Sequence, residues 1–172
     1  MPLTLAALNS GDAPSFVAAL GHLFEHSPWV AEGTFPKRPF RDADGLLAAL
    51  CETMYQAPVE RQLALVRAHP DLAGRLAKAG ALTEASSREQ AAAGLDRLNE
   101  AEGAEITRLN AAYTEKFGFP FVICARLTAK DAILTAMRIR LGNTPDGELS
   151  TALAEIAKIA RLRLNDALAK PS

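Results

Sequence analysis

One histidine stands where it could move protons. His69 lies in the segment 68–72, Ala-His-Pro-Asp-Leu, directly before a proline that ends a predicted helix. Because Pro70 cannot continue the helix, the imidazole ring can project from the helix end into a cleft. Histidine titrates near neutral pH, which suits it to proton transfer. The same position also suits a histidine that only closes the helix with a hydrogen bond, so both interpretations stay open at this point.

A second group of polar residues starts a long predicted helix. Ser86 and Glu89 have the spacing of a capping box, and Ser87 with Gln90 has it in the next register, with Arg88 between them. Capping alone explains this pattern. A helix start also presents backbone donors, and a carboxylate beside an amide can bind a urea-like or imide-like ligand. Both roles can hold together.

An arginine lies on the apolar face of the last predicted helix. Arg163 is separated by successive steps of three and four residues from the apolar residues Ala152, Ile156, Ile159 and Ala167. An inward guanidinium needs an anionic partner, which can be a ligand or a carboxylate of the protein. Arg161 shares its face with Lys158 and Asn165 and is expected to be solvated.

A short zinc-peptidase pattern offers a rival site. Residues 22–26 read H-x-x-E-H with Glu25 as the acidic residue, and we expect His22 and His26 on one helical face. A catalytic zinc needs a third protein ligand, and His26 lies directly before Ser27-Pro28 at the predicted helix end. A zinc hydrolase therefore remains an alternative, as does a non-catalytic helical interaction module with His69 as a structural cap.

Apolar spacing and helix-breaking residues predict the elements that must position these side chains. We expect helices between 12 and 28, around 46–54, from Pro58 to Pro70, from 86 to 117 with Gly103 as the point of a bend or break, from 130 to 141, and from 145 to about 168. Residues 29–40 are expected to form a packed loop without regular structure. Pro120 forces Phe119 to be extended, so 118–125 is expected to be an extended, buried connector.

Composition favours one helical domain over 1–172. Hydrophobic residues make up 49% and charged residues 23% of the chain, and the formal net charge is −1 with scattered basic residues, which argues against a nucleic-acid partner. No apolar run reaches the roughly 18 residues of a membrane span, and no basic leader is apparent. Cys51 and Cys124 form no disulfide framework or zinc motif, which suits a reducing compartment. Phosphate-binding loops and nucleophile motifs are missing.

In five ordered motifs the chain resembles the 2-oxo-4-hydroxy-4-carboxy-5-ureidoimidazoline (OHCU) decarboxylase family, enzymes of oxidative urate degradation that release allantoin. The resemblance extends over nearly the whole chain. The motifs are Glu25-His26-Ser27-Pro28-Trp29-Val30-Ala31-Glu32, Ala68-His69-Pro70-Asp71-Leu72, Ser86-Ser87-Arg88-Glu89-Gln90 with Gly94-Leu95, Phe117-Gly118-Phe119-Pro120-Phe121-Val122 and Ile159-Ala160-Arg161-Leu162-Arg163-Leu164.

The resemblance implies an all-α, single-domain helix bundle that works without cofactor or metal. It implies His69 as the general acid/base and Glu89 as a second catalytic residue. It also implies a cytoplasmic homodimer that acts on a small molecule and binds neither nucleic acid nor membrane. The substrate-binding residues implied by the resemblance are Pro70, Ser86, Ser87, Arg88, Glu89, Gln90, Phe121, Val122, Ile123, Cys124, Ala125 and Arg163.

Overall fold

The computed structural model describes residues 3–73 and 82–169. The chain divides into two compact units, Met1–Ala68 with Ala157–Ser172, and His69–Ile156. Every regular element among the described residues is a helix, which confirms the all-α prediction. One domain over 1–172 stays a prediction.

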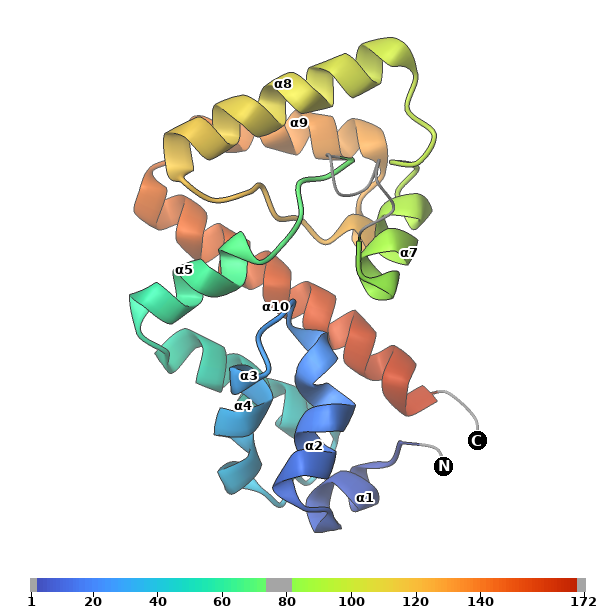
Figure 1. The fold of residues 1–172 in the computed structure, drawn as a ribbon, viewed down its shortest axis with the longest axis vertical. Helices are drawn as coiled ribbons and strands as arrows, with labels where there is room; N and C mark the ends of the chain where they lie inside the picture. The colour runs from blue at the N-terminus through green and yellow to red at the C-terminus, as the bar shows by residue number, and fades with distance from the viewer. Residues whose placement is uncertain (1–2, 74–81, 170–172) are drawn as a thin grey trace. The chain divides into compact units, whose positions relative to one another are not determined.

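The first unit contains most of the short helices. They are α1 Leu5–Ser10, α2 Ala13–Leu20, the 3-10 turn η1 Gly21–Leu23, α3 Trp29–Thr34, η2 Phe35–Lys37, α4 Ala43–Gln56 and α5 Val59–Arg67 (Figure 1). Side chains cap several starts: Asp12 accepts a hydrogen bond from the Ser15 amide at 2.9 Å, and Asp42 accepts one from the Gly45 amide at 2.7 Å. Helix α2 ends at Leu20, so it is shorter than the helix predicted between 12 and 28. Helix α1 was not predicted.

Residues 29–37 are helical, in α3 and η2, so the prediction of an irregular loop was wrong for them and holds only for 38–40. Helix α3 lies beside α4, and Gly33 makes the close approach possible. A Cβ atom at Gly33 would lie 2.8 Å from the Thr53 methyl group, closer than real Cβ contacts. Packing against α4 therefore stabilises a helical segment whose own sequence favours turns.

The second unit contains α7 Glu84–Ala92, α8 Glu100–Phe117, η3 Ala125–Leu127, α9 Lys130–Arg140 and the first half of α10 Pro145–Ala169. The continuous stretch predicted over 86–117 is two helices. Gly94 has a positive φ of 84° shortly after α7, and Asn99 with Glu102 forms a complete capping box that starts α8. Gly103 lies inside the first turns of α8 and breaks nothing.

The extended connector is confirmed. Gly118 ends α8 in the left-handed conformation with φ 75°, and Phe119 and residues 121–125 are buried. The two ends of the segment differ, because Gly118 is left-handed and Ala125 begins η3. Aromatic rings fix the connector to α8, on which the Tyr113 ring meets the Phe121 ring edge-on at 5.3 Å. Helices α8 and α9 lie side by side above it (Figure 1).

A buried polar cluster lies beside those rings. The Tyr113 hydroxyl donates to Glu148 Oε1 at 2.6 Å, and Arg140 Nε donates to the same oxygen at 2.5 Å. Burial, and then the hydrogen bond to the Glu148 carboxylate, raise the pKa of Tyr113 well above its usual value near 10. The phenol therefore keeps its proton in the folded protein at pH values where the unfolded chain has lost it.

This raised pKa predicts a loss of stability in alkali that depends on Tyr113. The stabilisation is fully present below about pH 10 and is lost as the pH rises further, at roughly 1.4 kcal/mol per pH unit, because only the unfolded tyrosine ionises there. We expect the difference in unfolding free energy between the wild type and Tyr113→Phe to be constant up to about pH 9 and to shrink above pH 10. Denaturant titrations from pH 7 to 11 measure it. A difference that stays constant over the whole range would contradict the prediction.

Candidate active site

His69 and the four residues after it form a tightly held loop at the start of the second unit. His69 follows Ala68, the C-cap of α5, and only 8% of its surface is exposed. Leu72 is buried, and Ala73 has a positive φ of 49°, a left-handed conformation that costs a non-glycine residue free energy. A strained alanine persists only where neighbouring groups hold it.

Two buried amide side chains hold this loop. Gln90 Oε1 accepts a hydrogen bond from the Ala73 amide at 2.9 Å, and Asn110 Nδ2 donates one to the Leu72 carbonyl at 2.9 Å. Both amides are more than nine-tenths buried. The loop that carries His69 is thereby tied to α7 through Gln90 and to α8 through Asn110.

Gln90 therefore has a structural task as well as its predicted binding task. Its carbonyl oxygen is used by Ala73, whereas its amino group donates to no other residue in the described parts of the chain. The donor side of the amide is thus available to a ligand. Ser86 and Gln90 are buried one helical turn apart on the same face of α7.

The helix start predicted at Ser86 was misplaced. Thr83 is the N-cap of α7, and its hydroxyl accepts a hydrogen bond from the Ser86 amide at 3.2 Å. Glu89 lies in the second turn, so the predicted capping boxes at Ser86–Glu89 and Ser87–Gln90 do not form. Capping no longer explains a carboxylate at Glu89. Ser87 and Arg88 are exposed and Glu89 is half-buried.

A cavity of about 390 Å³ opens beside this helix, a size suited to a small ligand. Ala73 of the His69 loop and Ser87 and Gln90 of α7 line it. The rest of its described lining is Leu82, Leu95, Asp96, Leu98 and Gly103. Helix α7 also packs against η3, at the end of the connector. Three of the predicted site segments, namely the His69 loop, 86–90 and 121–125, are thus neighbours in one unit.

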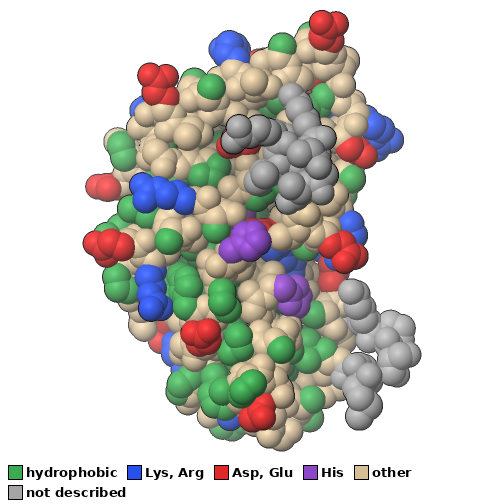
Figure 2. Space-filling view, viewed as in Figure 1, with side chains coloured by type: hydrophobic (Ala, Val, Ile, Leu, Met, Phe, Trp, Pro, Cys, Tyr) green, Lys and Arg blue, Asp and Glu red, His purple; other side chains and the backbone are tan. Residues whose placement is uncertain are grey.

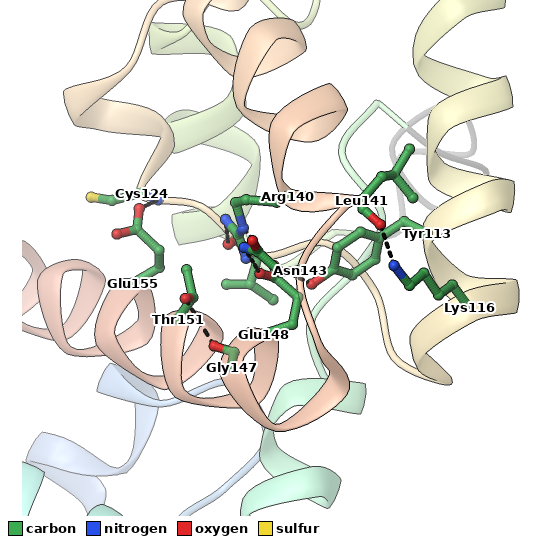
Figure 3. A network of polar contacts seen from close by, with 11 residues as sticks. Tyr113, Lys116, Cys124, Arg140, Leu141, Asn143, Gly147, Glu148, Thr151 and Glu155 are labelled. Atoms are coloured by element: carbon green, nitrogen blue, oxygen red, sulfur yellow. Dashed lines mark hydrogen bonds and ion pairs between the residues drawn. The ribbon is translucent and has the colours of Figure 1, made fainter.

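The connector backbone is held by charged side chains that sequence reasoning missed. Arg140 Nη1 donates to the Val122 carbonyl at 2.8 Å, and Glu155 Oε1 accepts from the Cys124 amide at 3.0 Å. Figure 3 shows Glu155 reaching from α10 to Cys124, and Arg140 beside Glu148. Arg140 follows the buried Ile133 and Met137 at helical spacing, so the reasoning that singled out Arg163 could have found it.

Arg163 has the anionic partner that its position requires. Its Nη2 donates to Glu25 Oε1 at 2.8 Å, and its Nη1 donates to the His22 carbonyl at 3.3 Å. Both side chains of the ion pair are at most 5% exposed. The inward orientation is confirmed, and a carboxylate of the protein meets the charge. Arg163 belongs to the first unit, and its contact with substrate stays a prediction. Arg161 is exposed, as expected.

The structure contradicts the alternative of a zinc site at His22, Glu25 and His26, because the two histidines do not share a helical face. Helix α2 ends at Leu20, so His22 lies in η1 and His26 lies outside any helix with a positive φ of 46°. The His26 side chain is 69% exposed, and Glu25 pairs with Arg163. Over residues 3–73 and 82–169 we find no group of three His, Cys, Asp or Glu residues that could hold a metal ion.

The surface carries no basic stripe on the face that Figure 2 displays. There, Lys and Arg side chains stand singly among Asp and Glu side chains over the described residues. As for membranes, none of the described helices has both the length and the apolar character needed to cross a bilayer.

Comparison with known proteins identifies similar sequences and a similar fold. The family model described as OHCU decarboxylase matches residues 9–165. A protein of Amia calva named 2-oxo-4-hydroxy-4-carboxy-5-ureidoimidazoline decarboxylase is 44% identical over 99% of this chain and 97% of its own. A protein of the same name from Haloferax volcanii is 45% identical over 94% of each. The crystal structure of an (S)-allantoin synthase superimposes with a TM-score of 0.75 and 28% identity, over 96% of this chain and 54% of that one.

Proposed function

The chain belongs to the OHCU decarboxylase family, and we propose that it converts 2-oxo-4-hydroxy-4-carboxy-5-ureidoimidazoline to (S)-allantoin and carbon dioxide in urate degradation. One observation carries the proposal for the site. Gln90 holds the loop that follows His69 and also lines the cavity, so the predicted acid/base loop, the predicted binding helix and a space for substrate share one residue.

The substrate makes the chemistry possible without a cofactor. Its carboxylate and a hydroxyl group share one ring carbon. When the bond to carbon dioxide breaks, the electron pair stays on that carbon and spreads into the neighbouring imine-like system. The resulting enol then takes up a proton from one face on the neighbouring ring carbon, which bears the ureido group. The hydroxyl group loses its proton and becomes the carbonyl of allantoin. Donors that are fixed before the reaction stabilise the developing negative charge best, because they need no reorganisation.

Each residue of the site then has a role in the proposal. His69 moves the proton that sets the handedness of the product, as a general acid/base. Glu89 accepts from the ureido or ring N–H groups, and the Gln90 amino group donates to a carbonyl. Pro70, Ser86, Ser87, Arg88 and the 121–125 backbone complete the pocket by family resemblance. Arg163 is assigned to an anionic or carbonyl group of the substrate on the same ground.

We extend the proposal to a cytoplasmic homodimer. Neither Cys51 nor Cys124 forms a disulfide in the described parts of the chain, which suits a reducing compartment. The dimer rests on resemblance to the family. Light scattering during gel filtration tests it: twice the 18.3 kDa chain mass supports a dimer, and the chain mass itself contradicts one.

The deciding assay follows the unstable substrate by circular dichroism. Uricase and hydroxyisourate hydrolase generate it from urate, and the protein is then added. We expect the dichroism signal of (S)-allantoin to appear at a higher rate than the spontaneous decay of the substrate. Only the (S) enantiomer should form. An unchanged, racemic decay would favour the alternative, a helical interaction module in which His69 is only a structural cap.

Glu89→Gln separates binding from helix stability. Because Thr83 caps α7, removal of the Glu89 charge should leave the cap of the helix intact. Loss of the charged acceptor should lower kcat/KM by about 10- to 100-fold. Thr83→Ala is the matched control for capping and should cost about 1 kcal/mol of stability. If Glu89→Gln melted like Thr83→Ala and kept full activity, Glu89 would have a structural role only.

A further inference from the structure

We propose that Glu155 and Arg140 are positioning residues, which hold the connector so that the main-chain N–H and C=O of Ile123 pair with an amide or ureido group of the substrate. The inference rests on the proposed function. It assigns a task to two buried charges that the reaction itself does not use.

The geometry of the peptide bond gives the direction. In a trans peptide the C=O and the following N–H point in opposite directions, and the only cis bond among the described residues is Arg38–Pro39. Arg140 Nη1 binds the Val122 carbonyl at 2.8 Å, so the Ile123 N–H points away from Arg140. Glu155 binds the Cys124 amide at 3.0 Å, so the Ile123 carbonyl points away from Glu155.

Ile123 thereby presents a backbone donor and a backbone acceptor that no described residue satisfies. Neither its N–H nor its C=O has a hydrogen-bond partner within the described parts of the chain, although the residue is only 9% exposed. Buried backbone groups are almost always paired in native proteins. An amide or ureido group, with adjacent N–H and C=O, matches such a pair of backbone groups and satisfies both.

The two anchors are well suited to hold a backbone still. Arg140 is 7% exposed, its Nε binds the fully buried Glu148, and its guanidinium lies 4.1 Å from the centre of the Phe121 ring. Glu155 is 9% exposed. Both bonds to the connector involve a side chain of a charged residue type, and charge-assisted hydrogen bonds are stronger than neutral ones. Each peptide group next to Ile123 is therefore fixed by a side chain that is itself packed.

Substitutions at Glu155 test the inference through KM. Glu155→Gln keeps a carbonyl oxygen for the Cys124 amide, whereas Glu155→Met keeps the length of the side chain and has no strong acceptor. We expect Glu155→Met to raise KM about tenfold, and kcat to change less, because a contact to a non-reacting part of the substrate is lost. Glu155→Gln should remain within about threefold of the wild type. Asn143→Ala is the matched control, because Asn143 donates to Glu148 Oε2 and not to the connector.

Amide hydrogen exchange gives a readout that a merely structural role would not change. Addition of (S)-allantoin, the product, should slow exchange of the Ile123 N–H in the wild type and much less in Glu155→Met. If Glu155→Met fails to fold, Arg140→Lys serves, because it keeps a charge for Glu148 and loses the Val122 contact. An unchanged KM in a folded, active variant, or equal effects of Glu155→Met and Glu155→Gln, would overturn the inference. A wild type without activity would instead refute the proposed function.

Discussion

His69→Asn is expected to lower the formation of (S)-allantoin by about 10²- to 10⁴-fold, the usual contribution of a general acid/base. Asparagine fills a similar volume at the end of α5 and keeps hydrogen-bonding groups, but its amide cannot take up and release a proton near neutral pH. The loop should stay in place, because Gln90 and Asn110 hold its later residues. The measurement is the dichroism assay with freshly generated substrate.

A second histidine provides the matched control. His26→Asn changes an exposed side chain whose backbone has φ 46°, a conformation that asparagine tolerates well. We expect its turnover and helical content to equal those of the wild type. For His69→Asn the far-ultraviolet spectrum should also stay unchanged. Wild-type rate and handedness in a folded His69→Asn protein would remove His69 from the mechanism.

The fold was predictable where the sequence carries its own local determinants. Leucines at helical spacing place α4, and Thr144-Pro145 places the start of α10. The local sequence also indicates the break between α7 and α8, because Asn99 and Glu102 have the spacing of a capping box that starts a new helix. The break was predicted at Gly103 instead, although a glycine in the first turns of a helix lowers the stability of the helix only slightly. Helix α3 was not predictable in this way, since its stability comes from contact with α4.

The site was predictable in its residues but not in its contacts. His69, Gln90 and the connector were identified from type and position, yet the bond between Gln90 and Ala73 joins residues 17 apart. The sequence shows that Arg163 needs an anion, but nothing in its spacing points to a partner 138 residues away. Glu25 was considered as part of a zinc motif for the same reason. Spacing along the chain does not show which distant residue contacts a side chain after folding.

Arg163→Met is expected to cost about 3–5 kcal/mol of unfolding free energy. The substitution leaves the Glu25 carboxylate 3% exposed and without its guanidinium, and a buried charge deprived of its partner is strongly destabilising. Arg161→Met, on the exposed face of the same helix, is the control and should change stability by less than about 0.5 kcal/mol. Urea titration of both variants gives the comparison. Equal costs would show that the ion pair contributes nothing.

The double variant Glu25→Met with Arg163→Met separates the ion pair from substrate binding. Replacement of both charges by apolar side chains should recover most of the lost stability, since neither charge is then left buried alone. The KM of this stable double variant then reports on the guanidinium itself. A rise in KM of about tenfold or more would mean that Arg163 contacts the substrate as well as pairing with Glu25. A wild-type KM would mean that the arginine serves the fold alone and that its assignment to the pocket must be withdrawn.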